Sequence, residues 1–253
     1  MNPDFVICGV EHSGTTLISD LFRQSPHFDA GFEVGVLLCP SPRTFPTLQP
    51  FADNLLAGWG ISEEDRAYCC DTDRYEAFYD RLKCKSSILK SPDVRIFDKT
   101  PRYFEQLGPC LDKVPVPFVA SYKDPRAIVG SDFKRCGTSD FFGWFDEYCE
   151  AKLAYLMDIY HQHQDQQDND RVLFVALEHL AFAPQDTVRT LFDHVGADFE
   201  TDYMVMKNLR YDNTRANIIT PEIVMEYRDT LGPDHIRAVE DAFSALKDWF
   251  YQI

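Results

Sequence analysis

Residues 5–22 constrain the fold most, because an apolar run leads through a turn of small residues into a helical pattern. Phe5–Cys8 is typical of a buried strand, and the apolar residues from Leu17 to Phe22 recur at helical spacing. The turn between them reads Gly9-Val10-Glu11-His12-Ser13-Gly14-Thr15-Thr16. Because the first N–H groups of a helix lack intrahelical partners, they form an anion-binding site. The segment therefore predicts a strand, an anion-binding turn and a helix.

The glycine spacing of this turn, G-x-x-x-x-G, matches a P-loop, in which a lysine after the second glycine grips the nucleotide phosphates. Thr15 occupies that place here. A P-loop nucleotide kinase, which also needs a magnesium-binding carboxylate that is not evident, is therefore the weaker alternative. The turn predicts phosphate binding without hydrolysis of a nucleoside triphosphate.

A second strand–loop–helix pattern follows in the middle of the chain. The apolar, β-prone run Val116–Tyr122 leads directly into Lys123-Asp124-Pro125-Arg126, and Pro125 suits the first turn of a helix. Lys123 and Ser131 flank this turn eight residues apart, so a cation and a hydroxyl can meet a further phosphate. The chain thus carries two candidate phosphate loops.

Together the two loops resemble the 3′-phosphoadenylyl sulfate (PAPS)-dependent sulfotransferase family. There the first loop is usually Lys/Arg-Ser-Gly-Thr-Thr, and the second is Arg-Asp/Asn-Pro-Arg with a serine eight residues after the first arginine. Two further segments match in the family order: Asp98–Phe104 resembles a Glu-Lys-Thr-Pro segment, and Arg171–Leu180 resembles a strand followed by a Glu-x-Leu turn. The resemblance covers most of the chain.

The resemblance implies a role for each matching residue. The first loop is expected to hold the 5′-phosphosulfate of PAPS, and the second its 3′-phosphate, with no metal ion required. Catalysis is expected to use cations at the transferring group and a carboxylate base for the acceptor. The expected catalytic residues are Glu33 as base and His12 and Lys99 as cations; the expected nucleotide-binding residues are His12, Ser13, Gly14, Thr15, Thr16, Lys123, Arg126, Ser131 and, as a weaker candidate to close over the nucleotide, Arg215.

His12 is the main departure from the family pattern, because it stands where lysine or arginine is usual. A protonated imidazole can supply the same charge, and nearby phosphates favour that form. The alternative is a non-catalytic nucleotide-binding protein of the same fold. Lys99 is preferred to Lys90 as the second cation because it lies in the better-matched Lys-Thr-Pro context.

Strands joined through helices imply a parallel sheet with helices on both faces. We therefore expect one α/β sulfotransferase domain over residues 1–253, with ligands beyond the carboxyl ends of a central parallel sheet. Four closely spaced prolines predict a loop over 39–60, and the charged segment from Ser62 to about Lys85 predicts a helix. A long helix is expected from Phe141 to about His163, with its aromatic residues in the core. Segments 34–85 and 136–165 are expected to contact the acceptor.

The amino-acid composition limits the classes of partner that this protein is expected to bind. A net charge of −16 disfavours nucleic acid, anionic membranes and polyanionic polysaccharides, so we expect a small-molecule or glycan acceptor that is not a polyanion. No apolar stretch is long enough to span a membrane, and Asp4 and Glu11 bracket the first apolar run, unlike a signal peptide. The eight cysteines form no C-x-x-C pair, which favours reduced thiols and a cytoplasmic protein.

Overall fold

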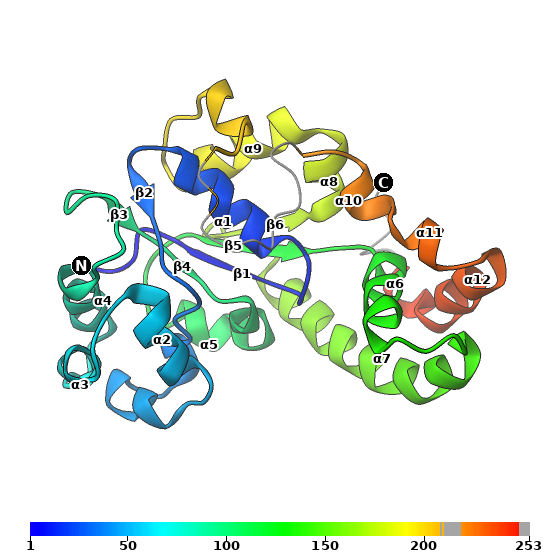
Figure 1. Ribbon diagram of the computed structural model, residues 1–253, viewed down its shortest axis with the longest axis horizontal. Helices are drawn as coiled ribbons and strands as arrows, with labels where there is room; N and C mark the ends of the chain where they lie inside the picture. Colours follow the sequence, from blue (N-terminus) through cyan, green and yellow to red (C-terminus); the bar gives the residue numbers. More distant parts are fainter. Residues whose placement is uncertain (208, 210–218, 248–253) are drawn as a thin grey trace.

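A four-stranded parallel sheet with strand order β4-β1-β5-β6 forms the centre of the computed structural model (Figure 1). The structure describes residues 1–207, 209 and 219–247. The strands of the central sheet are β1 (Val6–Gly9), β4 (Asp98–Lys99), β5 (Phe118–Tyr122) and β6 (Val172–Ala176). A small parallel pair, β2 (Phe28–Asp29) and β3 (Arg95–Ile96), forms a second sheet. Gly9 pairs with Ser121, so both candidate phosphate loops leave the sheet at the same edge.

Two hydrophobic cores lie on opposite faces of the central sheet, because successive strand residues point to alternate sides. In β1, Val6 and Cys8 join one core, whereas Ile7 joins the other. The core around Ile7 is closed by α1 (Thr15–Gln24), α8 (Leu177–Phe182) and α9 (Pro184–His194), which lie above the sheet in Figure 1. The other core is closed by α2 (Phe51–Trp59), α4 (Tyr75–Lys85), α5 (Leu107–Leu111) and α7 (Phe141–Gln166).

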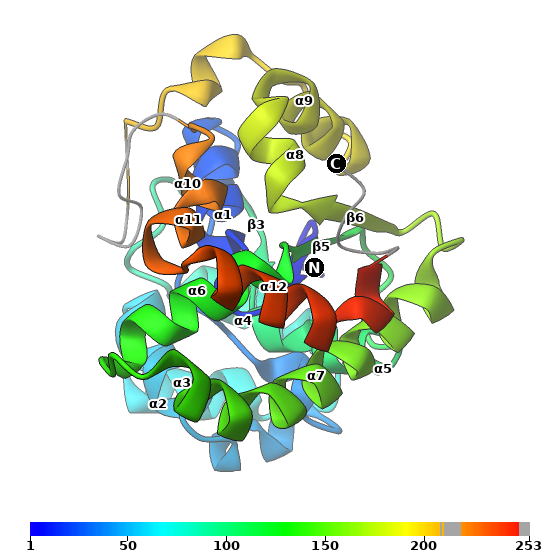
Figure 2. The ribbon, with the colours of Figure 1, turned by 90° about the vertical axis from the view of Figure 1, so that its right-hand side faces the viewer.

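The remaining elements surround these layers. Helices α6 and α7 both contact α12, and the three gather on the side of the molecule that faces the viewer in Figure 2. These elements are α3 (Glu63–Cys70), α6 (Pro125–Cys136), α10 (Glu222–Met225), α11 (Tyr227–Thr230), α12 (Pro233–Ala242) and the 3-10 helices η1 (Val36–Leu38), η2 (Pro42–Thr47), η3 (Pro101–Gln106), η4 (Thr201–Met204) and η5 (Ser244–Leu246). None of the helices in the described part of the chain combines the length and apolarity that crossing a bilayer requires.

The structure confirms the α/β class with its central parallel sheet, and it corrects three local predictions. The loop expected over 39–60 contains η2 and α2, because Phe51, Leu55 and Trp59 recur at helical spacing and bury one face of α2. The helix expected from Ser62 to Lys85 is two helices, α3 and α4, separated at 71–74. The expected aromatic core of α7 is also only partly correct, since Phe142 is 48% exposed.

Candidate active site

The turn after β1 is fastened to β5 through two serines. The Ser13 hydroxyl lies 2.6 Å from the carbonyl oxygen of Val10 and 3.0 Å from that of Ser121, and the Ser121 hydroxyl donates back to the Ser13 carbonyl. The Ser13 N–H also donates to the Val10 carbonyl. The polar atoms of Ser13 are therefore engaged inside the turn, whereas the N–H groups of Thr15 and Thr16 lie in the first turn of α1, where no intrahelical acceptor exists.

Two glycines allow this close packing. A Cβ atom on Gly9 would lie 2.4 Å from the Ser121 carbonyl oxygen, and one on Gly14 would lie 2.5 Å from a methyl carbon of Leu177. Gly14 also has a φ of 84°. His12, with a φ of 62°, adopts a left-handed conformation that costs a non-glycine residue about 1–3 kcal/mol. Backbone strain of this kind is typical of functional loops.

Lys123 lies at the carboxyl end of β5, at the start of the second loop, and only 5% of it is exposed. This burial lowers the pKa of its ammonium group to about 8. The next residue, Asp124, caps α6 by accepting the N–H of Arg126, and its own N–H donates to Glu178 Oε1 at 2.9 Å. Glu178 belongs to the Glu-x-Leu segment singled out in the sequence, so that segment supports the second loop.

His12, Lys123 and Arg135 lie near one another between the two loops. His12 is exposed, but protein atoms around its imidazole replace part of the surrounding water. This partial desolvation lowers the pKa of His12. The positive charges of Arg135 and Lys123 lower it further. Arg135 Nη1 donates to the Ser131 hydroxyl at 2.9 Å. Arg135 thus links the Ser131 hydroxyl to the positively charged surroundings of His12 and Lys123, and sequence reasoning had named it only as one of several cations near the site.

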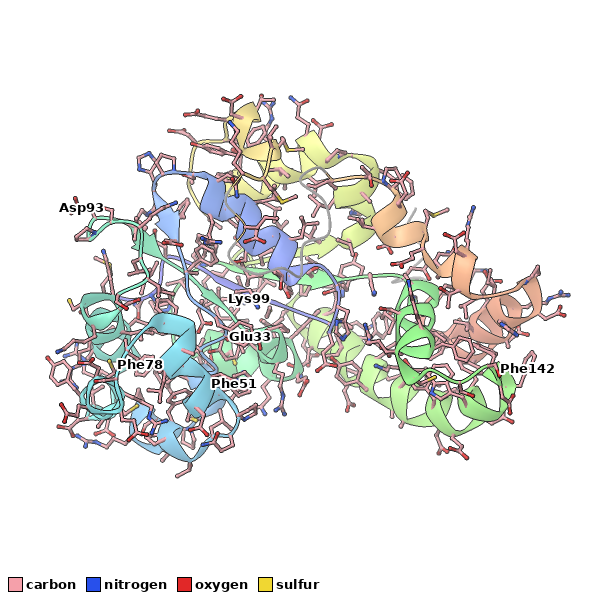
Figure 3. All side chains as sticks on the ribbon, viewed as in Figure 1. Glu33, Phe51, Phe78, Asp93, Lys99 and Phe142 are labelled. Atoms are coloured by element: carbon pink, nitrogen blue, oxygen red, sulfur yellow. The ribbon has the colours of Figure 1, made fainter. Side chains whose placement is uncertain are left out.

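Lys99 and Glu33 form an ion pair at the end of β4 (Figure 3). Lys99 Nζ lies 3.0 Å from Glu33 Oε1 and 4.9 Å from the centre of the Phe32 ring. Lys99 is 3% exposed and the Glu33 side chain is 23% exposed. The two catalytic residues predicted from separate sequence segments thus meet directly, with the carboxylate on the more accessible side.

A buried hydrogen-bond network holds Glu33 in this place. The Thr100 hydroxyl accepts the N–H groups of Val34 and Gly35 at 3.0 and 3.1 Å, and it donates to Asp98 at 2.8 Å. Asp98 also accepts the hydroxyls of two buried tyrosines, Tyr79 and Tyr103. Burial raises the pKa of Asp98, while these hydrogen bonds oppose the rise. The segment that carries Glu33 is therefore anchored through Thr100.

Other cations named from the sequence have different surroundings. Arg126 pairs with Asp124 and, at 2.9 Å, with Glu240, so it joins α6 to α12. Lys90 Nζ donates to the carbonyls of Arg23 and Ser25 at the C-terminal end of α1, away from the candidate phosphate-binding turn. Arg215 lies outside the described residues. Among the described residues, no group of three His, Cys, Asp or Glu side chains lies close enough to hold a metal ion.

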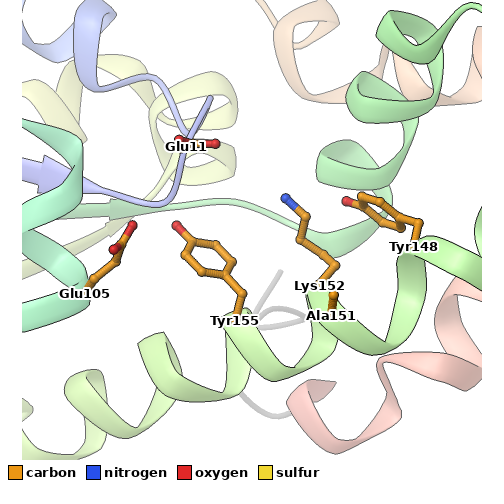
Figure 4. A pocket seen from close by; sticks show the side chains of 6 residues that line it. All are labelled: Glu11, Glu105, Tyr148, Ala151, Lys152 and Tyr155. Atoms are coloured by element: carbon orange, nitrogen blue, oxygen red, sulfur yellow. The ribbon is translucent and has the colours of Figure 1, made fainter. Parts of the chain in front are cut away.

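A cavity of about 300 Å³ opens between the first loop, η3 and α7 (Figure 4). We call it the α7 cavity; it is lined by Glu11, Glu105, Tyr148, Ala151, Lys152 and Tyr155. Four of these residues fall within segment 136–165, but sequence reasoning placed Tyr148 in the core and named none of them as site residues. The signal that could have found them is the spacing of Tyr148, Lys152 and Tyr155, which places polar tips on one face of a helix.

The chain matches the sequence profile of the Sulfotransferase family over residues 3–201. The chain belongs to this family. No curated protein matches it at a significant level of sequence similarity. Among solved structures, the sulfotransferase domain from the Synechococcus PCC 7002 olefin synthase is 18% identical, with a TM-score of 0.64 over 95% of this chain and 94% of that domain.

Two further sulfotransferase structures have the same fold. The sulfotransferase domain from the curacin biosynthetic pathway is 13% identical, with a TM-score of 0.60 over 96% of this chain and 98% of that one. A mouse sulfotransferase complexed with adenosine 3′,5′-bisphosphate (PAP) is 11% identical, with a TM-score of 0.57 over 97% of this chain and 84% of that one. At such low identity the likeness establishes the fold, and the site must be argued from this chain's own residues.

Proposed function

We propose that this sulfotransferase moves a sulfuryl group from PAPS to a hydroxyl or amine of a small acceptor. The observation that supports the proposal is the meeting of two candidate phosphate loops at one edge of the sheet, where Gly9 pairs with Ser121 and where the charges of Lys123 and Arg135 influence His12. In this family, such a pair of loops fits a nucleotide with phosphates at two positions.

The 5′-phosphosulfate is assigned to the N-terminus of α1. There the N–H groups of Gly14, Thr15 and Thr16 and the positive end of the helix dipole favour an anion. His12 lies beside them. Although its surroundings lower the pKa of the His12 imidazole, a bound dianion opposes this effect and favours the imidazolium. His12 is thereby suited to neutralise charge on the departing phosphate.

The 3′-phosphate is assigned to Lys123 and Ser131. Lys123 is nearly buried, and desolvation lowers the pKa of its ammonium group. A phosphate at this place would stabilise the protonated, positively charged form. Ser131 presents its hydroxyl on the second turn of α6, beside Arg135. Arg126 is assigned only a supporting role, because Asp124 and Glu240 already engage its guanidinium.

The transfer itself is assigned to Glu33 and Lys99. The acceptor oxygen or nitrogen bonds to sulfur while the bond from sulfur to the phosphate oxygen breaks in line, and the phosphate leaves with that electron pair. Glu33 takes the acceptor's proton, as a general base. Lys99 holds Glu33 at 3.0 Å and supplies positive charge near the transferring group. The products are the sulfated acceptor and adenosine 3′,5′-bisphosphate (PAP).

The proposal is tested by supplying ³⁵S-labelled PAPS with a panel of alcohols, phenols and amines. We expect labelled product with the wild type and a strong loss with Glu33→Gln, while PAP binding persists in both. PAP binding without transfer to any acceptor, in the wild type and in His12→Lys, would instead favour a non-catalytic nucleotide-binding protein. Failure of PAP to bind would reject the proposal altogether.

A further inference from the structure

Helix α8 begins in contact with both candidate phosphate loops. Strands β5 and β6 pair in parallel and end side by side, and α8 follows β6 directly. Its first residue, Leu177, lies against the first loop, because a Cβ atom on Gly14 would come within 2.5 Å of a Leu177 methyl carbon. Its second residue, Glu178, lies against the second loop, where Oε1 accepts the N–H of Asp124 at 2.9 Å. Two successive residues therefore set the spacing of the two loops.

The Glu178 carboxylate is only partly satisfied by hydrogen bonds. The residue is 7% exposed, and Oε2 finds no hydrogen-bond partner in the part of the chain that the structure describes. Burial raises the pKa of this carboxyl, while the hydrogen bond from Asp124 and the charge of Lys123 lower it. Because a buried carboxylate with few partners costs stability, this arrangement favours a role at the site over a role in the fold alone.

Lys123 is held directly by this contact. The N–H that Glu178 accepts belongs to the peptide group that joins Lys123 to Asp124. Lys123 is 5% exposed, and among the described residues no carboxylate lies close enough to form an ion pair with it. The charged groups that act on Lys123 come from several elements, and Lys123 in turn acts on His12 of the first loop: they are Asp132 and Arg135 of α6, Glu178 of α8 and Glu226 between α10 and α11.

Glu178 differs from the other two carboxylates around Lys123. Asp132 and Glu226 each pair with another lysine. Glu178 forms no ion pair within the described residues, and Lys123 is the cation whose charge acts on its carboxyl. The buried carboxylate and the buried ammonium therefore depend on each other, although they do not touch.

We propose that Glu178 is a positioning residue of the nucleotide site, which fixes the Lys123–Asp124 peptide with its hydrogen bond and stabilises the Lys123 ammonium with its charge. This inference rests on the proposed function, in which Lys123 binds the 3′-phosphate. The same negative charge repels a bound phosphate. Glu178 thus extends nucleotide binding to higher pH while lowering the affinity reached at low pH.

The test measures the affinity for PAP by calorimetry between pH 6.5 and 9, in the wild type and in Glu178→Gln. Glutamine keeps the volume and an acceptor oxygen for the Asp124 N–H, but it removes the charge. Without the carboxylate, the pKa of Lys123 should fall below its value of about 8, because a nearby negative charge favours the ammonium. We expect the affinity of Glu178→Gln to begin falling about one pH unit lower than that of the wild type, and to equal or exceed it at pH 6.5. A merely structural role would lower the affinity by the same factor at every pH.

Two controls show whether Glu178 acts through Lys123. Lys123→Arg stays protonated, so its profile reports the other titrating groups, His12 among them. Adding Glu178→Gln to Lys123→Arg should therefore leave the shape of that profile unchanged. Glu150→Gln removes the same charge from an exposed position of α7 and should leave the wild-type profile unchanged.

The inference would be overturned by an unshifted profile in Glu178→Gln, by an equal loss of affinity at every pH, or by the same shift in Glu150→Gln or in the Lys123→Arg background. Glu178→Asn, which is also uncharged, carries the same prediction if Glu178→Gln does not fold. Failure of both variants to fold would assign Glu178 to the stability of the fold and overturn the inference as well. Failure of the wild type to bind PAP would instead reject the proposed function, whereas PAP binding without the shift rejects only the role of Glu178.

Discussion

The proposed nucleotide side and the proposed acceptor side of this protein are built in different ways. On the nucleotide side, each loop follows a buried strand and opens a helix, and strand pairing of Gly9 with Ser121 brings the two loops together. On the acceptor side, the α7 cavity joins Glu11, Glu105 and Tyr155 from three distant segments. The comparison teaches that the proposed anion site is encoded locally, whereas the α7 cavity depends on how α7 packs against the loops.

Glu33→Gln should give the largest effect, because it removes the proposed base without disturbing either phosphate loop. Turnover should fall by about 10²–10⁴-fold, the usual contribution of a general base. The affinity for PAP should be unchanged, as measured by calorimetry. Glu150→Gln, which removes an equal charge elsewhere, should retain full turnover. A fully active Glu33→Gln enzyme would place the base elsewhere and remove Glu33 from the acceptor side.

Thr100→Val should show how the acceptor side is anchored. The substitution keeps the volume but leaves the N–H groups of Val34 and Gly35 and one oxygen of Asp98 without their hydroxyl partner. We expect the free energy of unfolding in urea to fall by about 1–3 kcal/mol. Thr190→Val, at an exposed helical position, should change it by less than about 0.5 kcal/mol. Equal stability of the two variants would show that the Thr100 network contributes nothing.

The pH dependence of PAP affinity should follow Lys123 on the nucleotide side. Below a pKa of about 8 the free protein carries the ammonium that the 3′-phosphate needs. Above it, binding must first add a proton to Lys123, so affinity should fall by up to about ten-fold per pH unit. Lys123→Arg stays protonated throughout this range and should flatten the profile. A wild-type profile that is already flat from pH 7 to 9 would contradict the role of Lys123.

Removal of metal ions should have the smallest effect of these changes, and the quantity measured is the affinity for PAP. Because His12, Lys99 and Lys123 are proposed to supply the positive charge that a kinase takes from Mg²⁺, PAP affinity should be the same with and without EDTA. The measurement is a pair of calorimetric titrations in matched buffers. An absolute requirement for Mg²⁺ would favour the nucleotide-kinase alternative.

Much of the nucleotide side could be predicted from the sequence because its signals are local. The strand before Gly9, the proline at the start of α6 and the step from Lys123 to Ser131 each lie within a dozen residues, and the structure contains them all. The sequence predicted a role for Lys99 and a role for Glu33, but it did not predict that the two side chains form an ion pair. The sequence also placed Arg126 among the nucleotide-binding residues, although its partners Asp124 and Glu240 favour a structural role.

The acceptor side could not be predicted in the same way. Tyr148 and Phe142 follow an apolar helical period, which cannot tell a core face from the wall of a cavity. Helix α2 was missed because the prolines at 40–50 suggested a longer loop, whereas they precede the helix and Pro50 occupies its N-cap. For α7 the deciding contacts come from segments far away in the sequence, whereas for α2 the helical spacing of Phe51, Leu55 and Trp59 was a local signal that the prolines outweighed.

The central claim is that the two loops form one site for a nucleotide with phosphates at both positions. Its most direct test is the affinity of PAP and of AMP for the wild type, Lys123→Ala and Lys134→Ala, measured by calorimetry. Lys134 is the control because it is an exposed cation of α6 that pairs with Glu226. We expect the wild type to prefer PAP strongly, and Lys123→Ala alone to lose about 1.5–3 kcal/mol of PAP binding with little change for AMP. Equal affinity of the wild type for PAP and AMP would contradict the account.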